Sequence, residues 1–351
     1  MYIGITGSTG FIGKNLVPAL IHSGFRLKLL IRDPGKEIPW KQVEKVYGDF
    51  NDMESLRNFV KDLDAIIHCA GAIRASHIED FIKGNYQSTK NLIDAINLES
   101  PLNLKIFLFL SSQSAQGPSN GLTPRKIEHI PSPVSWYGKS KLMAENYIIN
   151  NLQCPYYILR LASVYGPHDT ETLRFFKYVK NGFFPMPNGE KYLHMIYVED
   201  VVNLIVYMLG ANLALKNRIY FVSFPEIVSL SQIIDGIKTL MGKDNVIKVP
   251  IPAGITKLTL KINEAVFRLI GKSTIANSDK ANELVQKYWI GDPVPLFEET
   301  GFKPKYSLME GLYKTLEWYQ EFRVISVLHY LYLFQFDRLR KTSLPIHLKT
   351  F

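Results

Sequence analysis

The sequence predicts an α/β fold in which helices cover both faces of a parallel sheet. Short apolar runs, typical of buried strands, alternate with amphipathic stretches of helical period along the first half of the chain. A glycine-rich segment stands between the first apolar run and the first helical stretch, as in phosphate-binding units. The strands are expected near residues 2–6, 27–31, 65–69, 105–110 and 156–160.

The glycine-rich segment predicts a dinucleotide site. Its first glycine would permit the tight turn after the strand, its second would let a pyrophosphate approach backbone amides, and its third would let helix and strand pack closely. A flexible loop is the alternative, but the order of strand, glycines and helix favours cofactor binding. The residues of the segment are Gly7, Ser8, Thr9, Gly10, Phe11, Ile12 and Gly13.

Three further residues predict proton transfer. Tyr137 and Lys141 are four residues apart in an expected helix and therefore share one of its faces, and Ser112 ends an apolar strand. A nearby ammonium favours phenolate and would bring the pKa of the tyrosine down from ~10 towards neutrality. Ser112 would donate a hydrogen bond to a substrate oxygen that gains charge. Such a Tyr–Lys pair is common on solvated helices, so it indicates catalysis only beside the glycine segment.

With these motifs the chain resembles the extended short-chain dehydrogenase/reductase superfamily over about residues 1–322. The resemblance implies a Rossmann-type, doubly wound parallel sheet with a smaller, mainly C-terminal α+β substrate-binding region, and it makes a homodimer plausible. Further landmarks in the superfamily's order are Gly48-Asp49, His68-Cys69-Ala70-Gly71, Asn85 with Thr89-Lys90-Asn91-Leu92, Ser111-Ser112, Arg160 with Val164-Tyr165-Gly166-Pro167, and Tyr197-Val198 with Asp200.

Three regions are expected along the chain. Residues 1–166 form the nucleotide-binding Rossmann domain, and a soft boundary follows because the pattern then becomes irregular. Residues 167–322 form the substrate-binding region, interleaved with the last elements of the Rossmann sheet. Residues 323–351 form an apolar and basic extension that departs from the superfamily.

The resemblance also assigns cofactor contacts. Relatives that use NAD place an acidic residue after the second strand, whereas an arginine there accommodates the 2′-phosphate of NADP. Ile31 takes the place of the acid and Arg32 follows it, so we expect NADP(H) to be favoured over NAD(H), unless Asp33 takes the ribose instead. Asp49 resembles the residue that contacts adenine, with a surface turn as the alternative. The other expected cofactor contacts are Ala70, Gly71, Tyr137 and Lys141.

In the implied mechanism Tyr137 exchanges a proton with the substrate oxygen while hydride passes to or from nicotinamide, and Lys141 holds the nicotinamide ribose. Asn85 either orders the site or bridges local backbone. A family dehydratase would carry an Asp-Glu pair where this chain has Gln113-Ser114, so dehydration is disfavoured.

Epimerases often carry an arginine that binds the substrate diphosphate at the position of Leu193, although Lys191, His194 or Arg174 are available to replace it. We therefore expect an oxidoreductase that acts on a carbonyl or alcohol of a small, apolar or mixed-polarity substrate. A nucleotide-sugar epimerase and a non-catalytic, cofactor-bound structural subunit stay open. The candidate substrate contacts are Gln113, Arg174 and His194, and no metal site is predicted.

The formal net charge is +9 over 351 residues. No nucleic-acid recognition module is visible and the charges are spread along the sequence, so no nucleic-acid partner is expected. The sequence starts directly with a strand, without the pattern of a secretory signal, and Cys69 and Cys154 lie in apolar surroundings typical of reduced thiols. These features indicate a cytoplasmic protein.

Two segments suggest contact with lipid or with another subunit. Residues 324–336 form a nearly continuous apolar run of 13 residues, shorter than the ~20 that a spanning helix requires. The run either packs as an extra helix on the protein or a second subunit, or anchors the chain peripherally to anionic lipid. A basic, amphipathic stretch at 255–272 is suited to closing over a lipid-like substrate.

Overall fold

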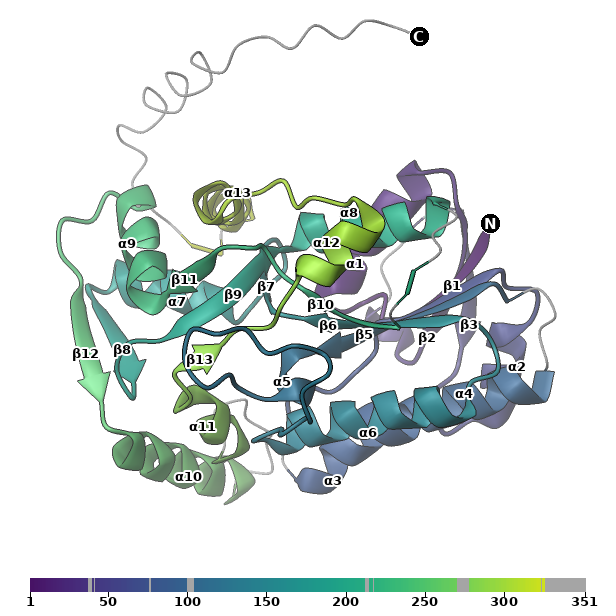
Figure 1. Cartoon of the computed structure of the whole chain (residues 1–351), viewed down its shortest axis with the longest axis horizontal. Coiled ribbons are helices and arrows are strands. Elements are labelled where there is room, and N and C mark those ends of the chain that lie inside the picture. Colours follow the sequence, from purple (N-terminus) through teal and green to yellow (C-terminus); the bar gives the residue numbers. More distant parts are fainter. Residues whose placement is uncertain are drawn as a thin grey trace, which may run out of the picture.

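A seven-stranded parallel sheet forms the body of the computed structural model (Figure 1). The structure describes residues 1–36, 40, 42–75, 77–99, 104–211, 215–216, 218–269, 278–322 and 324–325. The strand order is β10-β6-β5-β4-β1-β2-β3, and the five strands predicted from the sequence all lie within two residues of their expected bounds. The strands are β1 (Tyr2–Thr6), β2 (Arg26–Ile31), β3 (Val43–Tyr47), β4 (Ala65–His68), β5 (Ile106–Ser112), β6 (Tyr156–Leu161) and β10 (Ile219–Val222).

Helices cover both faces of this sheet, as predicted, and each face has its own hydrophobic core. The central strands are buried along nearly their whole length, which is why they read as continuous apolar runs rather than alternating ones. One face is covered by α1 (Phe11–His22), α8 (Val198–Gly210) and α12 (Val294–Thr300). The other is covered by α2 (Met53–Val60), α4 (Ser88–Glu99) and α6 (Trp136–Asn151).

The C-terminal half adds a smaller α+β region around a third core. Helix α8 and strand β10 come after residue 166 in the chain but belong to the main sheet and its cover, so the two regions interleave. A four-stranded sheet joins β7 (Ser163–Tyr165), β9 (Tyr192–Tyr197), β11 (Ile227–Ser229) and β13 (Tyr288–Trp289). A two-stranded sheet joins β8 (Phe183–Pro187) and β12 (Ile247–Ile251). The third core also includes α7 (Thr172–Lys180), α9 (Leu230–Leu240) and α13 (Leu308–Glu321).

Several remaining helices lie near the junction of the two regions (Figure 1). Helix α10 (Ala253–Leu269) packs against α11 (Ser278–Leu284), and α3 (Ile78–Phe81) packs against α6. Helix α3 continues into a π-helical segment, Ile82–Gln87, and α5 (Gln113–Gln116) follows β5 directly. These elements surround the carboxyl end of the middle strands, where the sequence predicts the site.

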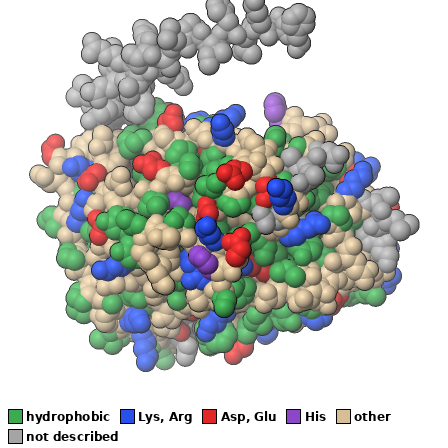
Figure 2. Space-filling model, in the orientation of Figure 1, with side chains coloured by type: hydrophobic (Ala, Val, Ile, Leu, Met, Phe, Trp, Pro, Cys, Tyr) green, Lys and Arg blue, Asp and Glu red, His purple; other side chains and the backbone are tan. Residues whose placement is uncertain are grey.

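Figure 2 shows one face of the molecule, on which basic side chains are interspersed with acidic and hydrophobic ones rather than gathered in one strip. The predicted apolar run at 324–336 lies outside the described residues beyond residue 325, as does the rest of the basic extension. Among the described helices, none has the length and apolar character required to cross a bilayer.

Candidate active site

The candidate site lies at the carboxyl edge of the main sheet, beside the neighbouring strands β1 and β4. From β1 the strand order continues through β2 and β3, and from β4 it continues through β5 and β6 in the opposite direction. In doubly wound sheets a crevice forms at this reversal, outside the strand ends. The loop of residues 7–13 follows β1, Ala70 and Gly71 follow β4, and Ser112 ends β5, so the sheet brings the predicted residues to one edge.

The glycine loop has the geometry of a phosphate cradle. Gly7 has a φ of +74°, and a Cβ there would lie 2.6 Å from the backbone nitrogen of Ala70, so only glycine fits. A Cβ on Gly13 would overlap the carbonyl oxygen of Gly7. Gly10 is the N-cap of α1 without a side-chain capping bond, which leaves amide donors for an anion at the helix N-terminus.

Ser8 adds a second sign that a ligand fits this loop. Its Oγ is buried and has no hydrogen-bond partner among the described residues. A buried hydroxyl of this kind is costly unless a ligand or water satisfies it. Thr9, Phe11 and Ile12 are half-buried around the start of α1. The residues present therefore fit the pyrophosphate of a dinucleotide.

The residues predicted to contact the adenosine half lie beyond β2 and β3. Arg32 is exposed and makes no ion pair with a described residue. Asp33 accepts a hydrogen bond from the Gly35 amide at 3.0 Å, which engages its carboxylate in a local turn. Asp49 is half-buried and accepts from the Asn51 amide at 2.7 Å.

Ser112 and Tyr137 meet at the other end of the crevice. The Ser112 Oγ accepts from the Ser114 amide at 3.1 Å, and the Ser112 and Tyr137 side chains are hydrogen-bonded. Burial raises the pKa of Tyr137, and the Glu283 carboxylate raises it further, while the Ser112 hydrogen bond and the Lys280 ammonium lower it. Tyr137 is therefore a protonated phenol at neutral pH in the free protein.

The Lys141 side chain is buried against β5. Its Nζ donates to the carbonyl oxygen of Leu110 at 2.9 Å and lies 4.7 Å from the centre of the Phe109 ring. Burial lowers the pKa of Lys141 to about 8. The cation that lowers the pKa of Tyr137 in this structure is Lys280, and the predicted roles of Lys141 beside a bound cofactor stay predictions.

Asn85 bridges backbone and helix behind Lys141. Its side chain accepts from the Ala72 amide at 2.8 Å and donates to the Ala72 carbonyl at 3.0 Å and to Ser140 Oγ at 2.9 Å. Gly71 makes this packing possible, since a Cβ there would lie 2.8 Å from the Asn85 Oδ1 and 3.1 Å from the Lys141 Nζ. Asn85 therefore fits both predicted alternatives. It bridges the backbone of Ala72, and by doing so it orders the loop after β4.

Helix α11 supplies charged groups that the sequence reasoning missed. Asp279 accepts from the backbone amides of Trp136 and Tyr137 at 2.6 and 3.2 Å. Lys280 and Glu283 form an ion pair of 2.8 Å beside Tyr137, and the buried Glu283 also accepts from Ser135 Oγ at 2.8 Å. Segment 278–284 carries no catalytic motif, and only the tertiary fold brings it to the N-terminus of α6.

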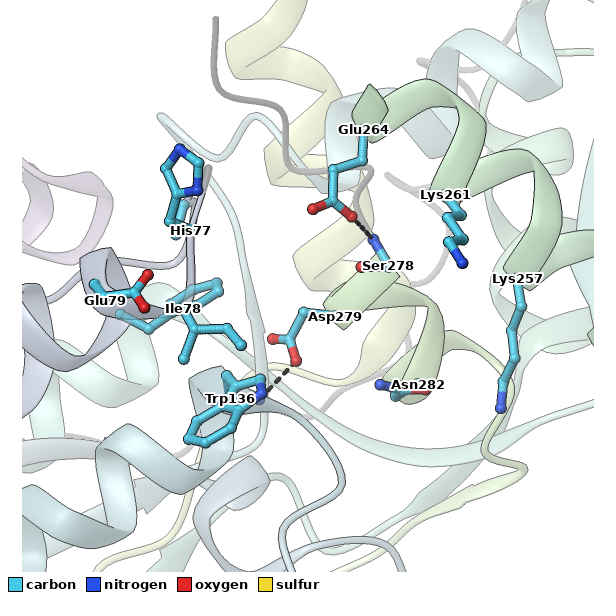
Figure 3. Close-up of a pocket in the computed structure, with 12 residues that line it drawn as sticks. His77, Ile78, Glu79, Trp136, Lys257, Lys261, Glu264, Ser278, Asp279 and Asn282 are labelled. Carbon is cyan, nitrogen blue, oxygen red and sulfur yellow. Dashed lines mark hydrogen bonds between the residues drawn. The ribbon is translucent and has the colours of Figure 1, made fainter. Parts of the chain in front are cut away.

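A cavity of about 520 Å³ opens next to these groups (Figure 3). Ile78 and Trp136 lie on one side of it, and Lys257 and Lys261 extend from α10 on the other. Phe81 also lines the cavity, and its ring lies 6.2 Å from the ring of Tyr137. The cavity is therefore of mixed polarity: Ala75, Ile78, Phe81 and Trp136 line it together with charged and polar side chains from α3, α10 and α11.

The three residues predicted to contact the substrate lie in different surroundings. Gln113 is buried directly after Ser112, and its Nε2 has no hydrogen-bond partner among the described residues. Arg174 lies 3.9 Å from Glu171, whose carboxylate also lies 3.5 Å from Arg74. His194 is buried in β9, with its Nδ1 2.9 Å from the Gly291 carbonyl oxygen. The residues that line the described cavity do not include Gln113, Arg174 or His194.

Comparisons with known proteins agree with the fold. The chain is 28% identical over 329 residues to the ceramide reductase of Caulobacter vibrioides, covering 91% of this chain and 94% of that protein. It is 25% identical over 324 residues to the UDP-glucose 4-epimerase of Vibrio cholerae, covering 89% of this chain and 94% of that protein.

The fold matches that of the Bordetella bronchiseptica enzyme WbmG in complex with NAD and UDP, at a TM-score of 0.73 and 19% identity over 92% of this chain and 96% of that one. Residues 3–223 match the model of the NAD dependent epimerase/dehydratase family. The chain therefore belongs to this family, and it is an NAD-dependent oxidoreductase or epimerase of the extended short-chain dehydrogenase/reductase type.

Proposed function

We propose that the protein transfers hydride between a nicotinamide dinucleotide and a carbonyl or alcohol of an apolar or mixed-polarity substrate. The observation that carries this proposal is the hydrogen-bonded Ser112–Tyr137 pair, which lies near a cavity of mixed polarity through the contact of Tyr137 with Phe81. A protonated phenol in such a place is ready to act as a general acid on a carbonyl oxygen.

The proton step follows from the hydrogen bonds of the pair. The Ser112 Oγ already accepts from an amide, so its own proton is free to be donated to the phenol oxygen or to a substrate oxygen. When bound, the cofactor supplies the hydride to the carbonyl carbon. Tyr137 gives its proton to the oxygen, and the Lys280 ammonium and the Ser112 hydroxyl stabilise the phenolate that is left. Alcohol oxidation is the same proton path reversed.

The residue at position 193 speaks against a nucleotide-sugar as the substrate. Leu193, at the position where epimerases often carry the diphosphate-binding arginine, packs against the third hydrophobic core. Similarity to a ceramide reductase supports a reductase. Gln113 and Ser114 replace the acidic pair that dehydration requires, which speaks against a dehydratase.

For the cofactor, we propose a preference for NADP(H) over NAD(H). Arg32 is exposed after β2 and has no ion-pair partner among the described residues, whereas the Asp33 carboxylate is engaged by Gly35. A guanidinium in this position suits the 2′-phosphate, because it forms charge-assisted hydrogen bonds with phosphate oxygens.

A panel of carbonyl compounds and alcohols tests the proposed function. The panel contains long-chain ketones, steroids, flavonoids and nucleotide-sugars, each with NADPH and with NADH. We expect oxidation of NADPH that depends on an apolar carbonyl compound. Interconversion of nucleotide-sugars without net cofactor oxidation would instead establish an epimerase and contradict the proposal.

A further inference from the structure

The first turn of α6, which carries Tyr137, is capped by a residue from a distant part of the chain. Amides in the first turn of a helix have no acceptor within the helix. The N-cap residue Ser135 satisfies one of them, since its Oγ accepts from the Gly138 amide at 3.0 Å. Asp279 satisfies two more, because its Oδ1 accepts from the Trp136 amide at 2.6 Å and its Oδ2 from the Tyr137 amide at 3.2 Å (Figure 3). Each oxygen of this carboxylate therefore holds one amide of the turn.

Asp279 belongs to α11, which is tied to the C-terminal half of the chain at both ends. At the start of the helix, the Ser278 amide donates to the Glu264 carboxylate of α10 at 2.9 Å. Just beyond its end, the Nζ of Lys191 donates to the Gln286 carbonyl oxygen at 3.1 Å. Helix α11 therefore connects the smaller C-terminal region to the first turn of α6.

Tyr137 is in this way held from both regions of the protein. Its phenol is hydrogen-bonded to Ser112 at the end of β5, and its amide is bonded to Asp279, 142 positions away in the sequence. The turn also packs closely on the segment after β5, since a Cβ on Gly138 would overlap the Ser114 carbonyl oxygen. A general acid must lie within hydrogen-bond reach of the reacting oxygen, and a misplacement of about 1 Å can cost about 10²-fold in rate.

We propose that Asp279 is a positioning residue for the reaction, which sets the place of the Tyr137 phenol by holding the backbone of its turn. Asp279 also lines the cavity, so one carboxylate belongs both to the cavity wall and to the support of the general acid. The proposal rests on the proposed role of Tyr137 as general acid. Asp279 takes no part in the proton step itself and acts only through Tyr137.

A double-mutant cycle of Asp279→Asn and Tyr137→Phe tests the proposal in the full-length protein. Hydride transfer is measured in a single turnover with NADPH and the carbonyl compound of the panel that the wild type reduces fastest. An asparagine keeps one acceptor oxygen and replaces the other with an NH2 group, which cannot accept from an amide. The variant therefore releases one of the two amides of the turn.

We expect Asp279→Asn to slow hydride transfer by about 10–100-fold in the wild-type background, with an unchanged dissociation constant for the cofactor. In the Tyr137→Phe background the same substitution should slow transfer by less than about twofold, because no phenol proton is left to be positioned. A defect that was merely structural would slow transfer in both backgrounds alike.

Asp200→Asn is the matched control. Asp200 is buried in α8, and its two oxygens also accept from two distant amides, those of Lys305 at 2.8 Å and Tyr306 at 3.1 Å. The control should lose stability in a thermal melt but transfer hydride at nearly the wild-type rate, because these amides lie outside α6. If Asp279→Asn fails to fold, Asp279→Glu takes its place in the cycle, since it keeps both oxygens but moves them by one carbon–carbon bond.

Amide hydrogen exchange provides a measurement that needs no substrate. Deuterium uptake by the peptide that covers residues 134–140 should increase in Asp279→Asn and stay at the wild-type level in Asp200→Asn. Unchanged uptake in Asp279→Asn would overturn the proposal, because the carboxylate would then not hold the turn.

Two outcomes of the cycle would also overturn the proposal. In the first, Asp279→Asn transfers hydride at the wild-type rate. In the second, Asp279→Asn slows transfer by the same factor with and without the Tyr137 hydroxyl, so that it does not act through the phenol. A wild-type rate in Tyr137→Phe alone is a different failure, since it contradicts the proposed function and this proposal with it.

Discussion

The Glu283 carboxylate accepts a hydrogen bond from Ser135 Oγ at 2.8 Å, across 148 positions of the chain. Ser135 is the N-cap of α6, and Tyr137 lies in the first turn of that helix. The contact therefore fixes a C-terminal helix to the start of the helix that carries the candidate general acid. It also sets a buried negative charge near the phenol, compensated by Lys280 at 2.8 Å.

This arrangement predicts the effect of Glu283→Gln on the pKa of Tyr137. The Glu283 charge raises that pKa and Lys280 lowers it, so removing the carboxylate should shift the phenol to a lower pKa. The shift is measured from the pH dependence of kcat/KM for alcohol oxidation, where the limb that rises with pH as Tyr137 loses its proton should move to lower pH. The matched control, Glu264→Gln, removes a carboxylate that lines the cavity from α10. An unchanged limb in Glu283→Gln would show that the carboxylate does not act on Tyr137.

Lys141→Met should stabilise the protein at neutral pH. The pKa of Lys141 falls from 10.5 to about 8 on folding because the buried ammonium is poorly solvated. Below pH 8 the lysine is charged in both states and its burial destabilises the fold. Between pH 8 and 10.5 the unfolded chain holds a proton that the folded chain has lost, so this penalty shrinks as pH rises.

We therefore expect Lys141→Met to raise the free energy of unfolding by roughly 1–3 kcal/mol at pH 7, with the gain declining above pH 8. Chemical denaturation at a series of pH values measures it. Lys139→Met, at an exposed position of the same helix, is the control and should show no such pH dependence. A loss of stability in Lys141→Met at pH 7 would mean that the Leu110 hydrogen bond outweighs the cost of burial.

Gly71→Ala should damage both stability and activity. The new Cβ would lie 2.8 Å from the Asn85 Oδ1 and 3.1 Å from the Lys141 Nζ, so the loop after β4 must shift. Overpacking of this kind costs about 1–3 kcal/mol, which thermal unfolding would detect. Gly210→Ala is the control, because no atom lies within 4 Å of a Cβ there. Equal melting temperatures for the two variants would show that the loop adapts without cost.

Arg32→Ser should change the cofactor preference. Loss of the guanidinium should weaken NADPH binding by about 10–100-fold and leave NADH binding nearly unchanged, because only NADPH carries the 2′-phosphate. Fluorescence titration with each cofactor measures the two dissociation constants. Lys36→Ser, in the turn that follows, controls for a general loss of positive charge. Tighter binding of NADH than of NADPH by the wild type would refute the preference itself.

The fold could be predicted because its signals are local. Buried parallel strands appear as apolar runs, and the turn at Gly7 requires a glycine at positive φ, so both are visible in the sequence. The short strands of the C-terminal half, such as β13 with two residues, leave no comparable pattern.

The candidate site could be predicted only in part. The spacing of Tyr137 and Lys141 identifies a shared helix face but not where the lysine ammonium goes, and it goes to the Leu110 carbonyl. Lys280 and Glu283 reach the site through contacts between segments more than a hundred residues apart. Such contacts depend on the packing of the whole chain, and no local motif encodes them.

Single-turnover hydride transfer in Tyr137→Phe, with a carbonyl substrate identified from the panel, tests the central claim most directly. The variant keeps the ring and its packing but loses the proton, so transfer should slow by about 10²–10⁴-fold while the cofactor dissociation constant stays the same. Tyr147→Phe, on the same helix and bonded to Asp94, is the control and should retain the wild-type rate. Transfer at the wild-type rate in Tyr137→Phe would contradict the role of this phenol as general acid.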